Sequence, residues 1–265
     1  MIPKILHYVW LGNKPKPDDV KKCLQSWLRF CPDFEIKEWN DESVKNIDCD
    51  YLKEAIEHKK WAFASDVVRL YALREFGGFY LDTDAELTDG LESFLDLDFV
   101  IGFEKFRDRY TIGTAFIGSR PGHKIVSDQY DSYQRRHFVK GSKLDKTTNT
   151  RRFADYFRKE YGINTKDGRF PVDLSDRDKI FPAYYFCCSE PGKKNYCIHH
   201  FNGSWFEDYD RFPLFSFGCL QLVKIKQNRS IPRTPFPLKA NEKKIFQYQY
   251  HNGLSFIILV WETRS

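Results

Sequence analysis

A long segment of mostly apolar residues, 60–76, ends at two consecutive glycines, Gly77 and Gly78. Its length and composition predict a helix that is buried on most sides. A glycine directly after a helix commonly adopts a left-handed conformation, which ends the helix. The apolar run 79–81 follows at once and predicts a short buried strand. The pattern therefore predicts a buried helix that leads directly into a buried strand.

The chain before this helix alternates between strand and helix patterns. Residues 5–11 form an apolar run that predicts a strand, and residues 18–30 carry apolar side chains at helical spacing. Residues 34–39 alternate between apolar and polar positions, which predicts a second strand. A strand, a helix and a strand within about 35 residues are typical of a parallel βαβ unit. The first part of the chain therefore predicts an α/β fold.

The chain after the buried strand continues this alternation. Its patterns predict strands at 99–103 and 112–118, helices at 121–137 and 150–161, and an extended segment at 180–186. Asn149 or Thr150 is the expected cap of the second helix. The polar residues 140–150 predict a mobile loop, which in an enzyme is often a lid. These elements extend the α/β pattern to the region of residue 200.

Two carboxylates, Asp82 and Asp84, follow the buried strand with one residue between them. Residues i and i+2 of an extended segment point the same way, so both acids can face one spot. Ligands of open α/β sheets collect at the carboxyl ends of strands. Two oxygen ligands at such a spot suit a hard cation such as Mg²⁺ or Mn²⁺. Solvated turn acids are the alternative interpretation.

An acid and an arginine, Asp66 and Arg69, interrupt the apolar helix three residues apart. Residues at this spacing share one face of a helix. A surface ion pair worth about 0–1 kcal/mol is the bland interpretation. The apolar surroundings favour a different one, because charged side chains on a buried helix usually bind a ligand or hold a site together.

The linked patterns S-D-x-x-R-L-Y at 65–71 and G-G-x-Y-L-D-x-D at 77–84 resemble the DXD glycosyltransferases. The resemblance is closest to the capsular-polysaccharide and mannosyltransferase family with a DXD sugar-binding region. It extends more distantly to the catalytic domains of the clostridial glucosylating toxins, and it covers about residues 1–205. It implies a GT-A fold, in which helices flank a Rossmann-like, mixed central sheet.

The resemblance also implies an activity. The expected reaction is metal-dependent, retaining transfer of a hexose from a nucleotide sugar, most simply a UDP-hexose, to a hydroxyl of a glycan acceptor. Such a hexosyltransferase would serve capsular or cell-surface polysaccharide synthesis.

The family's metal site is completed by a histidine near the end of its catalytic domain. The H-x-x-G-S-W pattern of this chain aligns on His200, which together with Asp82 and Asp84 is the expected ligand set. The neighbouring His199 stays open as the alternative, because alternation along a strand places the two imidazoles on opposite faces. An imidazole ligand suits Mn²⁺ better than Mg²⁺.

The resemblance further assigns residues that bind the donor. Trp10, after the first predicted strand, would stack on the nucleotide base. Asp66 and Arg69 would hold sugar hydroxyls, and Ser204 with Trp205 would grip the diphosphate. Asp82 contributes to both donor and metal binding. These four charged residues, Asp66, Arg69, Asp82 and Asp84, are the expected catalytic set.

Two other functions compete with this interpretation. A haloacid-dehalogenase-like phosphotransferase also has a D-x-D after a strand, but it needs Thr or Val two residues later, where this chain has Glu86. A non-catalytic protein that binds carbohydrates or nucleotide sugars is the second alternative. Glu104 is a conceivable nucleophile or base, because no second carboxylate pair for double displacement is evident.

Composition narrows the class of protein. The net charge of +5 is too small to argue for a nucleic-acid partner, and 42% hydrophobic residues support a packed core. The cysteines, seven in number, are expected to be reduced thiols, and without a C-x-x-C pair a structural zinc site is not expected. No signal peptide and no run of about 18 apolar residues is evident. The expected location is the cytoplasm, with the inner face of the membrane as a peripheral site.

Residues 206–265 are predicted to form a basic C-terminal extension, packed on or beside a catalytic domain of residues 1–205. Residues 211–265 hold nine Lys and Arg against two acids, a charge of +7, which leaves −2 for the rest of the chain. The apolar run 254–261 predicts either a buried last strand or a foot that contacts a membrane peripherally.

Overall fold

The computed structural model of this 265-residue chain describes residues 1–106, 109–165 and 167–201, and the backbone of four later strands. The chain divides into two compact units, residues 1–202 and residues 203–265. The division falls three residues before the predicted domain boundary at residue 205.

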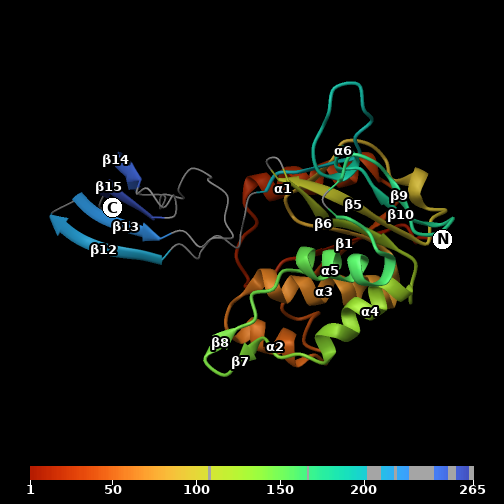
Figure 1. Cartoon of the computed structure of the whole chain (residues 1–265), viewed down its shortest axis with the longest axis horizontal. Coiled ribbons are helices and arrows are strands. Elements are labelled where there is room, and N and C mark those ends of the chain that lie inside the picture. The colour runs from red at the N-terminus through yellow and green to blue at the C-terminus, as the bar shows by residue number, and fades with distance from the viewer. Residues whose placement is uncertain are drawn as a thin grey trace. The chain divides into compact units, whose positions relative to one another are not determined.

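A seven-stranded sheet in the order β2-β1-β3-β6-β5-β10-β9 forms the centre of the first unit (Figure 1). Its strands are β1 (Ile5–Val9), β2 (Glu35–Trp39), β3 (Gly78–Leu81), β5 (Phe99–Phe106), β6 (Arg109–Ser119), β9 (Val172–Asp173) and β10 (Asp178–Phe181). β1 pairs in parallel with β2 and β3, whereas β6 runs antiparallel to both β3 and β5. The predicted mixed α/β sheet is therefore confirmed.

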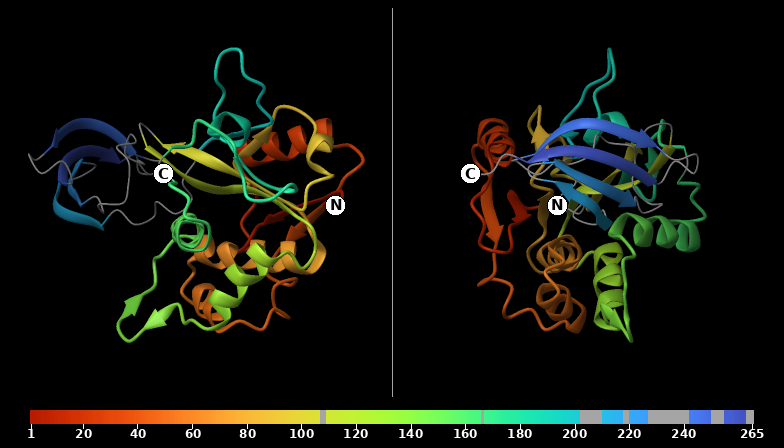
Figure 2. Two further views of the ribbon diagram at one scale, coloured as in Figure 1. Left: turned by 45° about the vertical axis from the view of Figure 1, so that its right-hand side comes forward. Right: turned by 90° about the vertical axis from the view of Figure 1, so that its left-hand side faces the viewer.

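Helices cover both faces of this sheet (Figures 1 and 2). They are α1 (Asp18–Phe30), α2 (Asp50–Glu57), α3 (Trp61–Phe76), α4 (Lys124–Gln134), α5 (Asn149–Tyr161) and α6 (Ala183–Phe186). One hydrophobic cluster lies under α2 to α5 and contains Tyr80, and the other lies under α1 and α6 and contains Phe79 and Leu81. Successive side chains of β3 point to opposite faces of the sheet, so this strand contributes to both hydrophobic clusters. None of the described helices is long and apolar enough to cross a bilayer.

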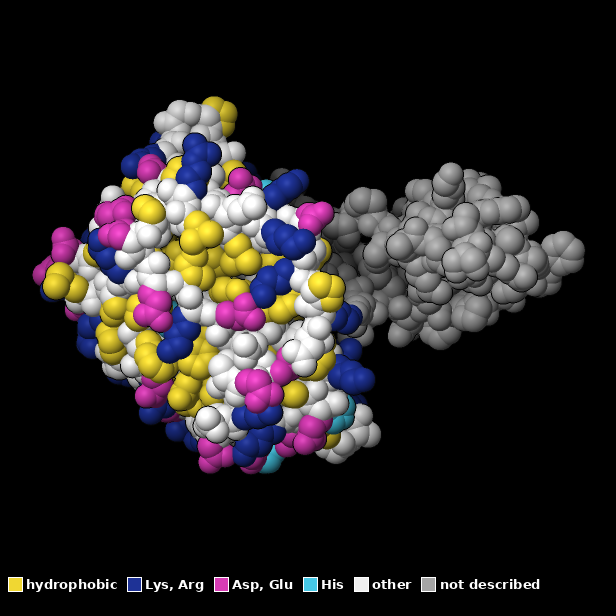
Figure 3. Space-filling model, turned by 180° about the vertical axis from the view of Figure 1, so that it is seen from behind, with side chains coloured by type: hydrophobic (Ala, Val, Ile, Leu, Met, Phe, Trp, Pro, Cys, Tyr) yellow, Lys and Arg dark blue, Asp and Glu magenta, His cyan; other side chains and the backbone are white. Residues whose placement is uncertain are grey.

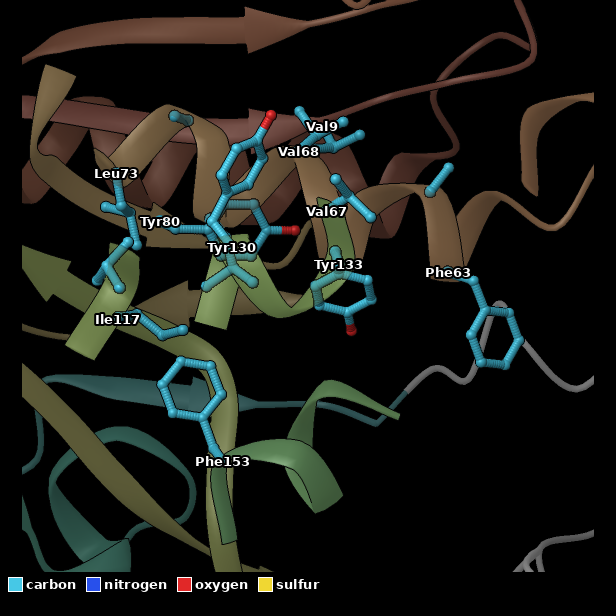
Figure 4. Packing of buried hydrophobic residues seen from close by; sticks show 14 of the residues in the cluster. Val9, Phe63, Val67, Val68, Leu73, Tyr80, Ile117, Tyr130, Tyr133 and Phe153 are labelled. Atoms are coloured by element: carbon cyan, nitrogen blue, oxygen red, sulfur yellow. The ribbon is translucent and has the colours of Figure 1, made fainter. Parts of the chain in front are cut away.

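The central helix α3 is buried along most of its length, as the sequence predicts. Its Val67, Val68 and Leu73 point towards aromatic side chains of the same core (Figure 4). Gly77 ends the helix with φ +64°, and a Cβ there would lie 2.6 Å from Pro121 Cδ. Gly78 has φ +97°. Since only glycine adopts these angles readily in so little space, the pair fixes the direct passage from α3 into β3.

A second small pairing joins distant parts of the unit. β4 (Ala85–Leu87) pairs antiparallel with β11 (Cys197–His199), so the chain after the D-x-D pattern meets the chain near residue 200. Trp27 of α1 is fully buried and donates its indole N–H to the Ala85 carbonyl at 2.8 Å. Helix α1 therefore supports β4 directly.

Three predicted segments differ from the structure. Residues 183–186 form α6 after Pro182, rather than an extended segment; Pro182 is its N-cap, where the missing N–H of proline costs no helical hydrogen bond. The predicted polar loop 140–150 includes a short hairpin of β7 (Val139–Lys140) and β8 (Lys143–Leu144). Helix α5 is capped by Thr148, whose hydroxyl accepts from the Arg151 N–H, instead of by Asn149 or Thr150. The lid function stays a prediction.

The second unit contains an antiparallel sheet in the order β12-β13-β15-β14. Its strands are β12 (Asp210–Phe217), β13 (Leu220–Lys226), β14 (Glu242–Gln249) and β15 (Ser255–Glu262). The predicted last strand is therefore present as β15, paired on both sides. Membrane contact by this unit stays a prediction.

Acidic and basic side chains are interspersed on the face of the first unit that Figure 3 shows, around a central hydrophobic area. Nucleic-acid-binding proteins typically cluster Lys and Arg on one face. Among the described side chains of this face, charges of both signs alternate instead.

We expect Trp27→Phe to destabilise the first unit by about 2–4 kcal/mol, because it removes a buried donor from the Ala85 carbonyl and leaves a small cavity. Urea unfolding followed by circular dichroism measures this free energy. Leu28→Ala is the matched control on the same helix, since Leu28 is 60% exposed, and its cost should stay below about 1 kcal/mol. Equal stabilities of wild type and W27F would contradict the role of Trp27.

Candidate active site

The two aspartates lie at the carboxyl end of β3. The Asp82 N–H donates to the Ala115 carbonyl of β6 at 2.8 Å, which extends the β3–β6 pairing by one residue. The Ala85 N–H donates to the Asp82 carbonyl at 2.9 Å and closes a turn that contains Asp84. Both carboxylates therefore lie on a short turn between β3, which pairs with β6, and β4, which pairs with β11.

A buried arginine connects the aspartates to α3. Arg69 Nη2 lies 3.1 Å from Asp66 Oδ1 and 3.2 Å from Asp82 Oδ1, and Nη1 donates to the Thr114 carbonyl at 2.5 Å. The side chains of Asp66 and Arg69 are each 4% exposed, which excludes the surface ion pair. Tyr80 adds a donor, since its hydroxyl lies 2.8 Å from Asp82 Oδ1. Asp82 is thus held by two donors at one oxygen.

The N-terminus of α5 contacts the other oxygen of Asp66. The Asn149 N–H donates to Asp66 Oδ2 at 3.1 Å, and its side-chain amide donates to the Asp66 carbonyl at 3.3 Å. Free N–H groups and the helix dipole favour a carboxylate at this position. The sequence predicts Asn149 only as a helix cap, because nothing local to it indicates that α5 begins beside α3.

Burial and neighbouring charges shift the pKa values of this network. Burial raises the pKa of the Asp66 carboxyl to about 6, against the opposing effect of Arg69. Burial alone would lower the pKa of Arg69, but nearby groups, Asp82 foremost, raise it instead. Burial also raises the pKa of Tyr80 well above its ordinary value. Arg69 is therefore always charged, and Tyr80 is a neutral donor.

Three residues could hold a cation. Asp82, Asp84 and His199 each offer one ligand atom, and these atoms all lie within 4.8 Å of one another. Ligands of one ion at about 2.0–2.3 Å are separated by distances of this order. Two carboxylate oxygens and an imidazole nitrogen are a donor set that suits Mn²⁺. The residues present therefore fit a divalent cation.

The structure brings His199, and not the predicted His200, to the two aspartates. His199 Nε2 lies 3.5 Å from Asp84 Oδ1, whereas His200 Nε2 lies 2.7 Å from Glu86 Oε2. His199 is paired with Ala85 across β11 and β4, and successive side chains of an extended segment point to opposite sides. The register of this pairing, which the sequence does not reveal, decides between the two histidines.

The His199 imidazole has a carboxylate on each side. Its Nδ1 lies 3.5 Å from Glu104 Oε2, and the ring packs on Phe201 at 4.1 Å between centroids. Burial lowers the pKa of His199, but Asp84 and Glu104 outweigh it and raise the pKa to about 10. The protonated imidazole thus balances the charges of Asp84 and Glu104, and a divalent cation would compete with the proton for the ring nitrogen.

A small pocket adjoins His199 between β5, β6 and α6. Its lining is Gly102, Phe103, Glu104, Gly113, Ala115, Phe116, Phe186, Cys187 and His199. Two interpretations of the small residues at 113–115 were open, room for a sugar and close packing. Close packing applies, because a Cβ at Gly113 would lie 3.0 Å from Glu104 Cβ. Room for a sugar stays a prediction.

The structure gives no direct contact between the other predicted donor-binding residues and the proposed metal ligands among the residues that it describes. Trp10 follows β1, which is the neighbour of β3 in the sheet, and its indole N–H donates to the Lys14 carbonyl at 2.7 Å. It therefore lies at the same edge of the sheet as Asp82. Ser204 and Trp205 lie outside the described residues.

Residues 17–101 match the family model described as the glycosyltransferase sugar-binding region containing a DXD motif. Over this region the chain is therefore similar to the DXD-type glycosyltransferases. The predicted resemblance is confirmed. Members of this class take a nucleotide-sugar donor and a glycan acceptor, and they generally use a divalent metal.

Similar sequences carry related names. The chain is 28% identical over 193 residues to an uncharacterised glycosyltransferase of Acanthamoeba polyphaga mimivirus, covering 69% of this chain and 74% of that protein. It is 33% identical over 98 residues to inositol phosphoceramide mannosyltransferase 3 of Schizosaccharomyces pombe, where the match spans 36% of this chain and 27% of the yeast protein.

Similar structures are more distant. The PaToxG glycosyltransferase superposes with a TM-score of 0.47 at 19% identity, over 61% of this chain and 70% of that one. A glycosyltransferase involved in the glycosylation of the major capsid of PBCV-1 superposes with a TM-score of 0.38 at 11% identity, over 69% and 84%.

We expect the pH dependence of stability to reveal the buried acid. The pKa of Asp66 is about 6 in the folded chain and about 3.9 in an unfolded one, so the folded state holds more protons between these values. The free energy of unfolding of the wild type should therefore fall, relative to that of Asp66→Asn, by about 1–3 kcal/mol from pH 4 to pH 7. Urea unfolding of both proteins across this range measures the difference. If the wild type instead gained stability relative to D66N as the pH rises, the charge of Arg69 would outweigh burial and hold the pKa of Asp66 low.

Proposed function

We propose that this glycosyltransferase moves a hexose from a nucleotide-sugar donor to a glycan hydroxyl, with retention of configuration and with a divalent cation held by Asp82, Asp84 and His199. The observation that carries the proposal is the convergence of these three side chains within 4.8 Å. They come from the end of β3, from the following turn and from β11, so only the fold unites them.

The leaving group explains why such a site is needed. A nucleoside diphosphate gains negative charge as its bond to the anomeric carbon breaks, and a bound cation offsets that charge as a Lewis acid. Within the chain, Arg69 and Tyr80 fix Asp82 Oδ1, which holds the carboxylate in one orientation. A ligand that is positioned before the donor arrives costs less to order.

From the sequence, Asp66 and Arg69 are expected to bind hydroxyl groups of the sugar. Their burial supports a more specific version of this role, in which Arg69 acts by orienting Asp82. Asp66 in turn balances the guanidinium and receives the Asn149 N–H at the start of α5.

The donor's other groups have proposed partners at the same edge of the sheet. Trp10 after β1 would stack on the base, a role that its half-buried ring supports. Ser204 and Trp205 would donate hydrogen bonds to the diphosphate, a proposal that rests on the sequence alone. The predicted donor is a UDP-hexose, and the name of the Schizosaccharomyces pombe relative adds mannose to the sugars worth testing.

The proposal extends to the ion and to the cellular role. Mn²⁺ is favoured over Mg²⁺ because the site includes an imidazole. A capsular or other cell-surface glycan is the proposed acceptor, by resemblance to the family. The charge of +7 on residues 211–265 supports peripheral contact with an anionic membrane surface on the cytoplasmic side.

We expect Asp84→Ala and His199→Ala to reduce donor turnover at least about 100-fold, because each removes a ligand of the cation. The measurement is release of nucleoside diphosphate from a panel of UDP- and GDP-sugars with Mn²⁺. His200→Ala is the matched control on the adjacent residue and should stay within about threefold of wild type, since its side chain contacts Glu86 instead.

Three results would contradict the proposal. Wild-type turnover by D84A would remove the assigned site. Tight donor binding without turnover would indicate a non-catalytic binding protein. A covalent aspartyl-phosphate would indicate the phosphotransferase alternative.

A further inference from the structure

Glu104 and His199 face each other from distant parts of the chain. Glu104 lies on β5 and His199 ends β11, and their closest atoms, Oε2 and Nδ1, are 3.5 Å apart. The side chains are only 15% and 13% exposed. The opposite edge of the ring, at Nε2, faces Asp84. The imidazole therefore lies between an acid of the proposed metal site and an acid outside it.

The backbone confines both partners. The His199 N–H donates to the Cys187 carbonyl at 2.9 Å, and the Lys105 N–H donates to Cys187 Sγ at 3.4 Å. Cys187 thus links the residue after Glu104 to His199. On the other side, Gly113 leaves no room for a side chain, since its Cβ would lie 3.0 Å from Glu104 Cβ. The backbone that presents the carboxylate and the backbone that presents the imidazole are therefore both held in place.

The contact between Glu104 and His199 matters because of how a histidine binds a metal ion. Imidazole binds a cation through one nitrogen while the other nitrogen carries the proton, and an acceptor at that N–H fixes tautomer and orientation. His199 Nδ1 is buried, and at 3.5 Å from Glu104 it makes no hydrogen bond of ordinary length among the described residues. A shift of about 0.5 Å would bring the pair to a normal hydrogen-bond distance.

We propose that Glu104 is a positioning residue, which accepts a hydrogen bond from His199 Nδ1–H and so directs Nε2 towards the cation. This inference rests on the proposed metal site of the previous section. Glu104 approaches the edge of the ring opposite to the edge that faces Asp84, so it acts through His199 and is neither a ligand nor a nucleophile. The earlier candidate role of Glu104 as nucleophile or base is replaced by this one.

Direct titration of Mn²⁺, followed by the electron paramagnetic resonance signal of the free ion, tests the inference without relying on turnover. It is done with and without UDP, on wild type, Glu104→Ala, Glu104→Gln, His199→Ala and the double variant E104A/H199A. Glu86→Ala is the matched control, because Glu86 makes the equivalent contact with His200 on the opposite face.

We expect E104A to weaken Mn²⁺ binding about 10–100-fold. E104Q should fall between E104A and wild type, because its amide oxygen still accepts a hydrogen bond. The double variant should bind no more weakly than H199A, since both changes affect one interaction. E86A should stay within about twofold of wild type. The ¹⁴N modulation that a coordinated imidazole adds to the spin echo of bound Mn²⁺ should be weaker or altered in E104A.

Other results would overturn the inference. Wild-type Mn²⁺ affinity in E104A, with or without a lower melting temperature, would reduce Glu104 to a structural residue. Wild-type affinity with donor turnover lost would restore the role of nucleophile or base. A wild-type protein that binds no Mn²⁺ in either condition would overturn the metal site and the inference together. Mn²⁺ binding that depends on Glu104, in a protein that transfers no sugar, would support the inference and contradict the proposed function.

Discussion

One buried guanidinium holds the site together. Arg69 lies between Asp66 and Asp82, and its charge is the reason two acids can be placed so close to one another inside the fold. Removing a charge from such a group leaves the others uncompensated, which costs far more than the loss of a surface ion pair. The position of Asp82 therefore depends on α3, and α3 in turn depends on the glycine pair that ends it.

A second constraint is the pairing of β4 with β11. It places His199 opposite Ala85, one residue after Asp84, and so turns a chain separation of more than a hundred residues into a shared site. The backbone of His200 strengthens this link, since its N–H donates to the Asp84 carbonyl at 3.0 Å. His199 thus contributes its side chain to the site, whereas His200 contributes only its backbone N–H, which strengthens the link between β4 and β11.

The sequence predicted those parts of the site that local patterns determine. Asp82 and Asp84 follow a strand at a spacing that allows both to face one spot. Asp66 and Arg69 interrupt an apolar helix, which favours a buried site over a surface ion pair. The choice of His200 over His199 was wrong, because it followed the motif alignment, whereas the register between strands far apart in the chain decides which imidazole reaches the aspartates. Asn149 was missed for the same reason: its contact with Asp66 exists only once α5 packs beside α3. Ser204 and Trp205 remain predictions from the sequence.

The proposed site centres on one cation between Asp82, Asp84 and His199. Crystals grown with Mn²⁺ and UDP, measured at the manganese absorption edge, locate that ion without reference to any activity. We expect an anomalous peak about 2.2 Å from a carboxylate oxygen of each aspartate and from His199 Nε2. A peak beside His200 and Glu86, or a UDP complex with no peak near the aspartates, would contradict it.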